Sequence, residues 1–163
     1  MMTFYQTVES PLGTLIVTTD GEALTGVYFE GQQHFKGILA GWQYTEHNAI
    51  LSSTCRQLNE YFSKQRAVFD VPLAPLGTEF QRAVWKTLQA IDFGERLSYS
   101  GLAEKVGRPD AVRAVAAAVG RNPISVVIPC HRIVGKDNSL TGYAGGLARK
   151  AALLELEVAE RQV

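Results

Sequence analysis

The first thirty residues are predicted to form a β-meander, because short runs rich in β-branched and aromatic residues alternate with turn-forming residues. The runs cover residues 3–8, 14–18 and 24–29. Pro11-Leu12-Gly13 separates the first two runs, and Asp20-Gly21, a dipeptide typical of tight hairpins, separates the last two. This order predicts three antiparallel strands.

An amphipathic helix is predicted over residues 47–64. Its apolar positions Leu51, Cys55, Leu58 and Phe62 recur at steps of four, three and four residues, which places them on one face. Because Cys55 lies on this stripe, we interpret it as a small buried hydrophobe.

Residues 65–77 contain Pro72, Pro75 and Gly77 and are predicted to be an extended connector. The chain is therefore divided into two domains. Residues 1–76 form a scaffold domain with its linker, and residues 77–163 form a second domain of different composition.

The second domain is predicted to begin with a helix capped by Thr78, because Gln81 three residues later completes a capping-box pattern. The apolar positions of this helix are Phe80, Val84, Leu88 and Ile91.

Two short helices are predicted next, over residues 98–107 and 108–119. Pro109 suits the start of the second helix, and Gly107 and Gly120 suit the two ends. Two short helices joined by a brief turn make a helix-turn-helix candidate. The second helix is rich in alanine, with Arg113 as its long cationic side chain, although alanine-rich helices also pack in protein cores.

Residues 124–128 form an apolar run that predicts a short buried strand, ended by Pro129. Cys130-His131-Arg132 follows directly. A glycine-containing loop then leads to a last helix, whose predicted apolar face comprises Leu147, Ala151, Leu154 and Val158.

Composition points to a soluble globular protein. The 163 residues are 46% hydrophobic and 20% charged, and no apolar run approaches the roughly 18 residues needed to span a bilayer. No secretory signal is visible at the start, so a cytoplasmic protein without membrane contact is expected. The two cysteines are expected to be free thiols, and the His and Cys residues lack the paired spacings of a metal site.

The formal net charge of zero hides two opposed halves. Residues 1–76 carry a net charge of −3 and residues 77–163 carry +3, while residues 105–136 alone carry +5. A basic cluster of this size can contact phosphates, although solvated surfaces also look like this.

Cys130 is a candidate nucleophile, because an imidazole and a guanidinium lie within two residues and both lower the pKa of a thiol. Neighbours in an extended strand point to opposite faces, however, so His131 reaches the sulfur only if Pro129 turns the backbone or a water bridges the two. A buried structural thiol is the alternative interpretation.

The segment from Asn122 to Gly135, with its Pro-Cys-His-Arg core at residues 129–132, resembles the active-site segment of the O6-alkylguanine-DNA alkyltransferases. Residues 77–85, Ser98-Tyr99, Arg113-Ala114-Val115 and residues 143–146 resemble other segments of this family, in the same order.

The resemblance implies an α+β fold. A small N-terminal antiparallel sheet with a helix would be ribonuclease H-like. A mostly helical C-terminal domain would carry a helix-turn-helix of the winged-helix type and the alkyl acceptor.

The resemblance also implies a mechanism that needs no cofactor. His131 would deprotonate Cys130 through a water, and Cys130 would accept the alkyl group from O6 of guanine. The resulting thioether would have no route back to a thiol. Glu157 would fix the tautomer of His131. Tyr143 would donate a proton toward the leaving guanine, and Asn122 would hold the turns around the site. From the residues alone, Glu157 reads as a solvated carboxylate, Tyr143 as a packed loop aromatic and Asn122 as part of an ordinary Asn-Pro turn.

The implied partner is duplex DNA with an alkylated base, bound through the minor groove by a monomer. The base would be flipped, with Arg113 filling the vacated stack and Tyr99 crowding the phosphate. Ala114, Arg132 and Gly145 are expected to contact DNA or substrate. O4-alkylthymine is a further candidate substrate.

Three positions depart from the family pattern: Ala152 in place of a frequent tryptophan, Val158 in place of glycine, and Ala144 in place of a serine. The first two bear on how the last helix packs and therefore on where Glu157 lies. Ala144 bears on contacts to O6.

Two other functions stay open from the sequence. Alkyltransferase-like proteins share the DNA-binding half but replace the cysteine, and the presence of Cys130 counts against that interpretation. A helix-turn-helix transcription factor normally needs a dimer or an additional domain, for which the chain offers no evident sequence.

Overall fold

The computed structural model describes residues 2–161, with side chains up to residue 158. Contacts divide the chain into two units, each with its own core. One unit contains the chain up to Leu76 together with Pro123–Val127, and the other contains Gly77–Asn122 and the chain from Ile128 onward. The short segment Pro123–Val127 thus belongs to the first unit, although it lies within the sequence range expected for the second domain.

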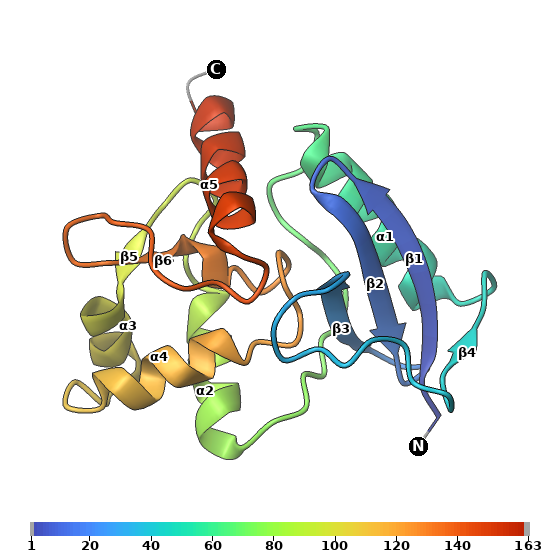
Figure 1. Ribbon diagram of the computed structural model, residues 1–163, viewed down its shortest axis with the longest axis horizontal. Coiled ribbons are helices and arrows are strands. Elements are labelled where there is room, and N and C mark those ends of the chain that lie inside the picture. The colour runs from blue at the N-terminus through green and yellow to red at the C-terminus, as the bar shows by residue number, and fades with distance from the viewer. Residues whose placement is uncertain (1, 162–163) are drawn as a thin grey trace. The chain divides into compact units, whose positions relative to one another are not determined.

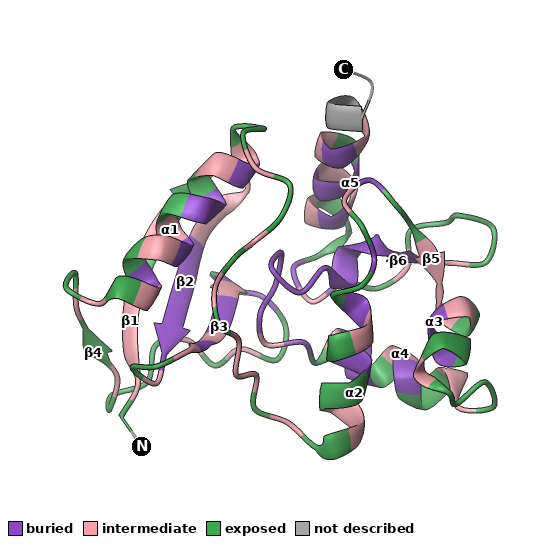
Figure 2. Cartoon of the chain, turned by 180° about the vertical axis from the view of Figure 1, so that it is seen from behind, coloured by how far each residue is buried: buried purple, intermediate pink, exposed green. Residues whose placement is uncertain are grey.

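The first unit is built on a four-stranded sheet of order β3-β2-β1-β4. Strands β1 (Phe4–Ser10), β2 (Gly13–Thr19) and β3 (Leu24–Phe29) form two antiparallel hairpins, and the two-residue β4 (Gln43–Tyr44) pairs parallel to β1. The three predicted strands are confirmed. β2 is buried along most of its length (Figure 2), as expected of a central strand.

Helix α1 (Ala49–Phe62) lies along β1 and β2 (Figure 1) and begins at Asn48, whose side chain accepts a hydrogen bond from the Leu51 N–H at 3.0 Å. Its buried residues are Leu51, Thr54, Gln57, Leu58 and Tyr61. The interpretation of Cys55 as a small buried hydrophobe is only partly right. Cys55 is half-buried, and its thiol donates to Gln6 Oε1 at 3.4 Å.

Two polar side chains could join the buried face of α1 because each has hydrogen-bond partners there. The Thr54 hydroxyl donates to the Ile50 carbonyl at 2.7 Å. Gln57 exchanges two hydrogen bonds with the backbone of Asp70, at 2.8 and 3.0 Å, and so holds the connector. The connector also bonds to β3, since the Leu24 N–H donates to the Pro72 carbonyl at 2.8 Å.

The segment Pro123–Val127 is buried from Ile124 onward, but the predicted strand is wrong. Val27 of β3 exchanges two backbone hydrogen bonds with it, at 2.9 and 3.0 Å, and only Ile124 forms a bridge. The chain then turns sharply, because the Val127 N–H donates to the Ser125 carbonyl across a single residue, Val126, whose φ is 70°. A γ-turn with positive φ is rare and strained, above all for a β-branched residue.

The second unit is mostly helical, and the α+β class is confirmed. Its elements are α2 (Glu79–Leu88), β5 (Leu97–Ser98), α3 (Tyr99–Val106), α4 (Val112–Gly120), the 3₁₀ turn η1 (Cys130–Arg132), β6 (Ile133–Val134) and α5 (Leu147–Arg161). Helices α2, α3 and α4 pack on one another (Figure 1), and the Trp85 indole of α2 donates to the Ala118 carbonyl of α4 at 2.8 Å.

The helix-turn-helix forms, but α4 starts later than predicted. Helix α3 ends at Gly107 with φ 85°, the left-handed conformation that glycine adopts without a Cβ clash. The chain then makes a turn through Pro109 in which the Ala111 N–H donates to the Arg108 carbonyl at 2.9 Å, and α4 begins only at Val112. Proline here shapes the turn instead of opening the helix.

The predicted apolar face of α5 was right at Leu154, which is buried, but wrong at Leu147, while Ala151 and Val158 are half-buried. Leu147 is 49% exposed, while the buried residues include Lys150, Leu153, Leu154 and Glu157. Two ionisable residues occupy the inner face, so a prediction that places every charge outside rotates the helix incorrectly.

The capping box of α2 is expected to stabilise the start of this helix. Thr78 Oγ1 accepts from the Gln81 N–H at 3.1 Å and Gln81 Oε1 accepts from the Thr78 N–H at 3.0 Å. Thr78→Ala is expected to lower the free energy of unfolding by about 1 kcal/mol, seen as a lower urea midpoint with an unchanged slope. Thr87→Ala, which removes only a hydroxyl bonded to the Ala83 carbonyl within α2, is the control. Equal losses in the two variants would contradict a capping role.

Candidate active site around Cys130

A second turn places Cys130. The Cys130 N–H donates to the Ile128 carbonyl at 2.8 Å across Pro129, whose φ of −81° and ψ of 63° are those of an inverse γ-turn. The chain continues into the 3₁₀ turn η1. Cys130 and His131 therefore do not alternate as in a strand, and the turn at Pro129 that the sequence required is present.

Asn122 holds this turn. Its amide donates to the Ile128 carbonyl at 2.8 Å. Asn122 and Ile128 flank the segment Pro123–Val127, which belongs to the first unit. Its side chain also hydrogen-bonds Cys130. Asn122 is 4% exposed, so the expected role of holding the turns around the site agrees with its position.

The Cys130 thiol is protonated at neutral pH. It is 5% exposed, and burial raises its pKa to about 11. The Asn122 hydrogen bond and the positive charge of Lys150 act in the opposite direction without overcoming burial. A reaction that needs the thiolate must therefore supply a base.

His131 is the base that the site offers. It is fully buried, and its Nε2 lies 2.7 Å from Glu157 Oε2. Burial, together with the charges of Arg132 and Lys150, lowers the pKa of the imidazole, and the opposing effect of Glu157 is smaller. His131 is therefore neutral at neutral pH.

The tautomer of His131 follows from its partner. An ionised carboxylate only accepts hydrogen bonds, so Nε2 carries the proton and Nδ1 carries the free lone pair. Within the described residues, Nδ1 has no hydrogen-bond partner, although it is buried. The free lone pair on Nδ1 can therefore accept a proton.

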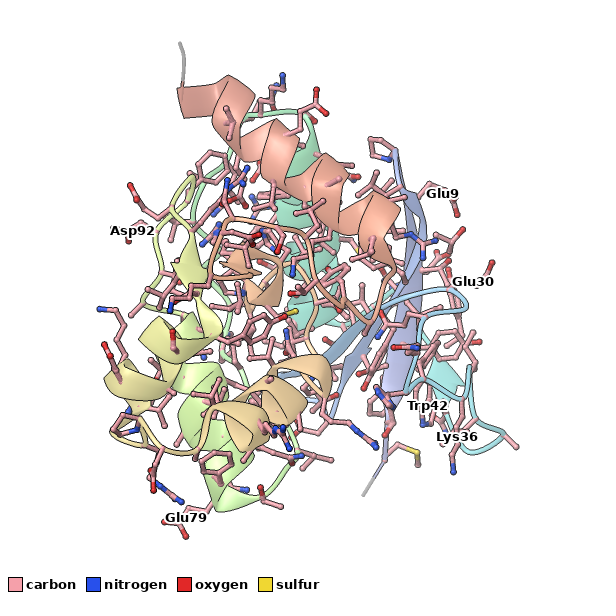
Figure 3. The ribbon with its side chains drawn as sticks, turned by 60° about the vertical axis from the view of Figure 1, so that its left-hand side comes forward. Glu9, Glu30, Lys36, Trp42, Glu79 and Asp92 are labelled. Atoms are coloured by element: carbon pink, nitrogen blue, oxygen red, sulfur yellow. The ribbon has the colours of Figure 1, made fainter. Side chains whose placement is uncertain are left out.

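Glu157 is surrounded by donors. Besides His131, it accepts from Arg132 Nε at 2.9 Å, Arg132 Nη2 at 3.0 Å and the Gly94 N–H at 3.2 Å. Burial raises its pKa, but the hydrogen bonds and charges of His131 and Arg132 outweigh burial and bring the pKa to about 2. Asp92, two residues before Gly94, points out to solvent (Figure 3). The turn that contains both residues therefore contributes a backbone N–H to the site and not the Asp92 carboxylate.

Arg132 is buried with the catalytic candidates. Besides its two bonds to Glu157, it donates from Nη1 to the Ile91 carbonyl at 2.5 Å. The expectation of direct DNA contact by Arg132 conflicts with this placement, because its guanidinium is used inside the protein and only 7% of the residue is exposed.

Lys150 is a residue that the sequence analysis missed. Its side chain is fully buried, its Nζ donates to the Thr141 carbonyl at 2.9 Å, and it lies 6.0 Å from the centre of the Tyr99 ring. The Thr141 hydroxyl in turn donates to Tyr99 Oη at 3.0 Å. Burial lowers the pKa of Lys150 to about 8. Its spacing of seven residues from Glu157 on α5 was the signal that places both on one face.

The remaining candidates lie on the 141–146 loop and on α4. Tyr143 is 8% exposed and Gly145 is buried in this loop, which therefore packs against the second unit. On α4, Arg113 and Ala114 are exposed, whereas Val115 faces the core. Both side chains lie on the exposed side of α4.

The three departures from the family pattern leave this network intact. Ala152 and Val158 are half-buried on α5, and Glu157 between them still reaches both His131 and Arg132. Ala144 is half-buried in the 141–146 loop.

Neither a metal centre nor a membrane span is present in the part of the chain that the structure describes. No group of three His, Cys, Asp or Glu side chains there is arranged to hold a metal ion. No helix in that part has the length and apolar character to cross a bilayer.

Comparison with known proteins identifies relatives over the whole chain. Residues 79–159 match the family model for the 6-O-methylguanine DNA methyltransferase DNA binding domain, and residues 3–75 match the ribonuclease-like domain of the same proteins. A methylated-DNA–protein-cysteine methyltransferase from Haemophilus influenzae is 43% identical over 94% of this chain and 86% of its own length. The constitutive enzyme of that name from Bacillus subtilis is 42% identical over 96% of each chain.

The fold has the same relatives. A crystal structure of Mycobacterium tuberculosis OGT in complex with DNA superimposes with a TM-score of 0.89 and 41% identity, over 96% of this chain and 94% of that one. DNA binding is therefore supported by a relative solved with DNA and by the matched DNA-binding domain.

The buried ion pair yields a prediction for stability. Glu157→Gln leaves the Arg132 guanidinium buried without its counter-charge, which is expected to lower the free energy of unfolding by about 3–5 kcal/mol at pH 7. Glu155→Gln, on an exposed position of the same helix, is the control and is expected to leave urea unfolding unchanged.

The same prediction has a pH signature. Because the pKa of Glu157 in the folded protein is about 2, below its ordinary value of 4.5, its contribution is present above pH 4.5 and is lost as the pH falls toward 2. The stability difference between wild type and Glu157→Gln should narrow over that range. A constant difference would show that Glu157 is not held as a carboxylate.

Proposed function

The chain belongs to the 6-O-methylguanine DNA methyltransferase family, and on this premise we propose that it repairs DNA by transferring the alkyl group from O6 of guanine irreversibly to Cys130. The observation that carries the proposal is the network Cys130, His131 and Glu157, in which a buried thiol lies beside a neutral imidazole oriented by a carboxylate.

The first step is removal of the thiol proton. With Nε2–H donated to Glu157, His131 accepts the Cys130 proton at Nδ1 through a water. Glu157 stabilises the imidazolium that forms, as the third member of a catalytic triad does. Asn122 hydrogen-bonds the sulfur, and the Lys150 charge favours the thiolate.

The second step is the transfer itself. The Cys130 thiolate attacks the alkyl carbon, so a carbon–sulfur bond forms and the bond from that carbon to O6 breaks. Tyr143 donates a proton to the leaving guanine. The proton that His131 took from the thiol then replaces the proton that Tyr143 lost. The product is a thioether, which has no route back to the thiol, so one molecule repairs one lesion.

Access to the base requires flipping. A duplex base lies beyond the reach of any buried side chain, and extruding it costs a few kcal/mol. The exposed Arg113 of α4 fills the vacated stack, and Ala114 beside it keeps the helix surface small enough for the minor groove. Tyr99 crowds the target phosphate, and Gly145 lets the 141–146 loop approach the base.

DNA binding and alkyl transfer belong to residues 77–163, and residues 1–76 serve as a scaffold. We propose a monomer acting on alkylated duplex DNA through the minor groove, with no cofactor. The same transfer assay with O4-alkylthymine in the duplex tests the second candidate substrate.

Label transfer tests the reaction. Duplex DNA carrying radiolabelled O6-methylguanine is expected to pass one equivalent of label to the protein, mapped to the peptide containing Cys130. Cys130→Ser should abolish the transfer, while Cys55→Ser, the matched control at the other thiol, should keep it. Lesion binding without transfer by the wild type would instead indicate a non-catalytic binding protein, and tight sequence-selective binding of undamaged DNA would indicate a transcription factor.

Arg113→Ala tests base flipping. The variant is expected to repair duplex lesions roughly 10- to 100-fold more slowly, which corresponds to about 1.4–2.7 kcal/mol, while reacting normally with free O6-benzylguanine. Arg121→Ala, at another exposed arginine just after α4, controls for lost positive charge. Equal losses on duplex and free base would refute the role of Arg113.

A further inference from the structure

All three side-chain nitrogens of Arg132 donate a hydrogen bond inside the protein. Its Nε and Nη2 atoms donate to the two oxygens of Glu157 at 2.9 and 3.0 Å, and Nη1 donates to the Ile91 carbonyl at 2.5 Å. The guanidinium carbon also lies 5.8 Å from the centre of the Phe93 ring. Two parallel bonds between a guanidinium and a carboxylate fix both the position and the plane of the carboxylate.

The orientation matters because Glu157 also accepts from His131. Each carboxylate oxygen is bonded to Arg132, and Oε2 is bonded in addition to His131 Nε2 at 2.7 Å. A carboxylate free to rotate would lose the geometry of this third bond. Arg132 thus sets the direction from which the imidazole is held.

The charges around His131 add a second consequence. Glu157 faces it from α5 with a negative charge, Lys150 faces it from the same helix with a positive one, and Arg132 and the protonated Cys130 adjoin it on η1. With Arg132 present, the Glu157 charge is already balanced. Without it, the buried carboxylate would have its strongest remaining partner in a protonated imidazole, because buried charges require a counter-charge.

We propose that Arg132 is a positioning residue that balances the charge of Glu157 and fixes its plane, so that His131 stays neutral with Nδ1 ready to accept the thiol proton. This inference rests on the proposed alkyl transfer for its kinetic consequence. It assigns Arg132 a task inside the site in place of the direct DNA contact that the sequence suggested.

A purely structural role for Arg132 makes a different prediction. Such a residue would lower stability, and the transfer rate would fall by the same factor at every pH. A residue that controls the charge of His131 instead moves the pH at which transfer fails. The acid limb of the rate profile therefore separates the two roles.

The experiment compares single-turnover transfer rates of wild type, Arg132→Gln and Arg132→Lys, using O6-methylguanine duplex DNA and folded protein between pH 5 and 8. Loss of the positive charge in Arg132→Gln is expected to shift the acid midpoint upward by about one to two pH units. Arg132→Lys, which keeps a charge but not the two-pronged geometry, is expected to restore the midpoint toward wild type while remaining slower.

Trp85→Phe is the stability control, because it removes a buried hydrogen bond of the second unit without touching the network. It is expected to lower stability without moving the acid midpoint. An unchanged midpoint in Arg132→Gln, or equal shifts in Arg132→Gln and Trp85→Phe, would overturn the proposal.

A measurement that does not depend on alkyl transfer separates the test of Arg132 from the test of the proposed function. Nitrogen-15 NMR of labelled histidine distinguishes a neutral ring protonated at Nε2 from an imidazolium. His131 is expected to be the neutral Nε2–H tautomer in wild type at pH 7 and to convert to the imidazolium at a higher pH in Arg132→Gln than in wild type. An unaltered spectrum in Arg132→Gln would refute the role of Arg132, whereas failed transfer by wild type would refute only the proposed reaction.

Discussion

Removing a carboxylate from water costs several kcal/mol unless charges and donors replace the lost hydration, and Glu157 meets this condition with donors from two other segments of the second unit. Arg132 and His131 come from η1, and the Gly94 N–H comes from the turn after α2. Because α5 carries the acceptor, the last helix, the turn and the reactive segment must all be in place together. The geometry of the candidate base is therefore a property of the assembled unit and not of the Cys-His dipeptide.

The buried thiol and the neutral imidazole suit a nucleophile that acts once. Burial raises the pKa of Cys130 to about 11, which keeps the sulfur in its unreactive protonated form until a base and a substrate are aligned. The same burial keeps His131 uncharged and able to take the proton. A low-dielectric surrounding thus limits side reactions of the sulfur with electrophiles in solution.

Local sequence signals predicted local structure well, and the errors arose where tertiary contacts decide. The Thr78 capping box and the Gly107 helix end depend on residues within a few positions, and both are present. Residues 124–128 have strand propensity, yet a γ-turn at Val126 breaks the run and an inverse γ-turn at Pro129 follows it. Only tertiary packing can hold Val126 in its strained conformation. The face of α5 was misplaced because Glu157 and Lys150 are buried with partners that lie far away in sequence. Glu157 was identified as catalytic by resemblance alone, and Lys150 was missed.

Because residues 123–127 belong to the first unit, the two halves of the chain cannot be exchanged freely between proteins. The side chains of Ile124, Val126 and Val127 are buried in the unit whose remaining residues end at Leu76. A gene cut between the halves would separate these residues from the β3 edge that bonds to them, leaving an apolar segment uncovered a few residues before the thiol. A functional exchange of halves between relatives therefore requires that the five-residue segment of one protein fit the β3 strand of the other.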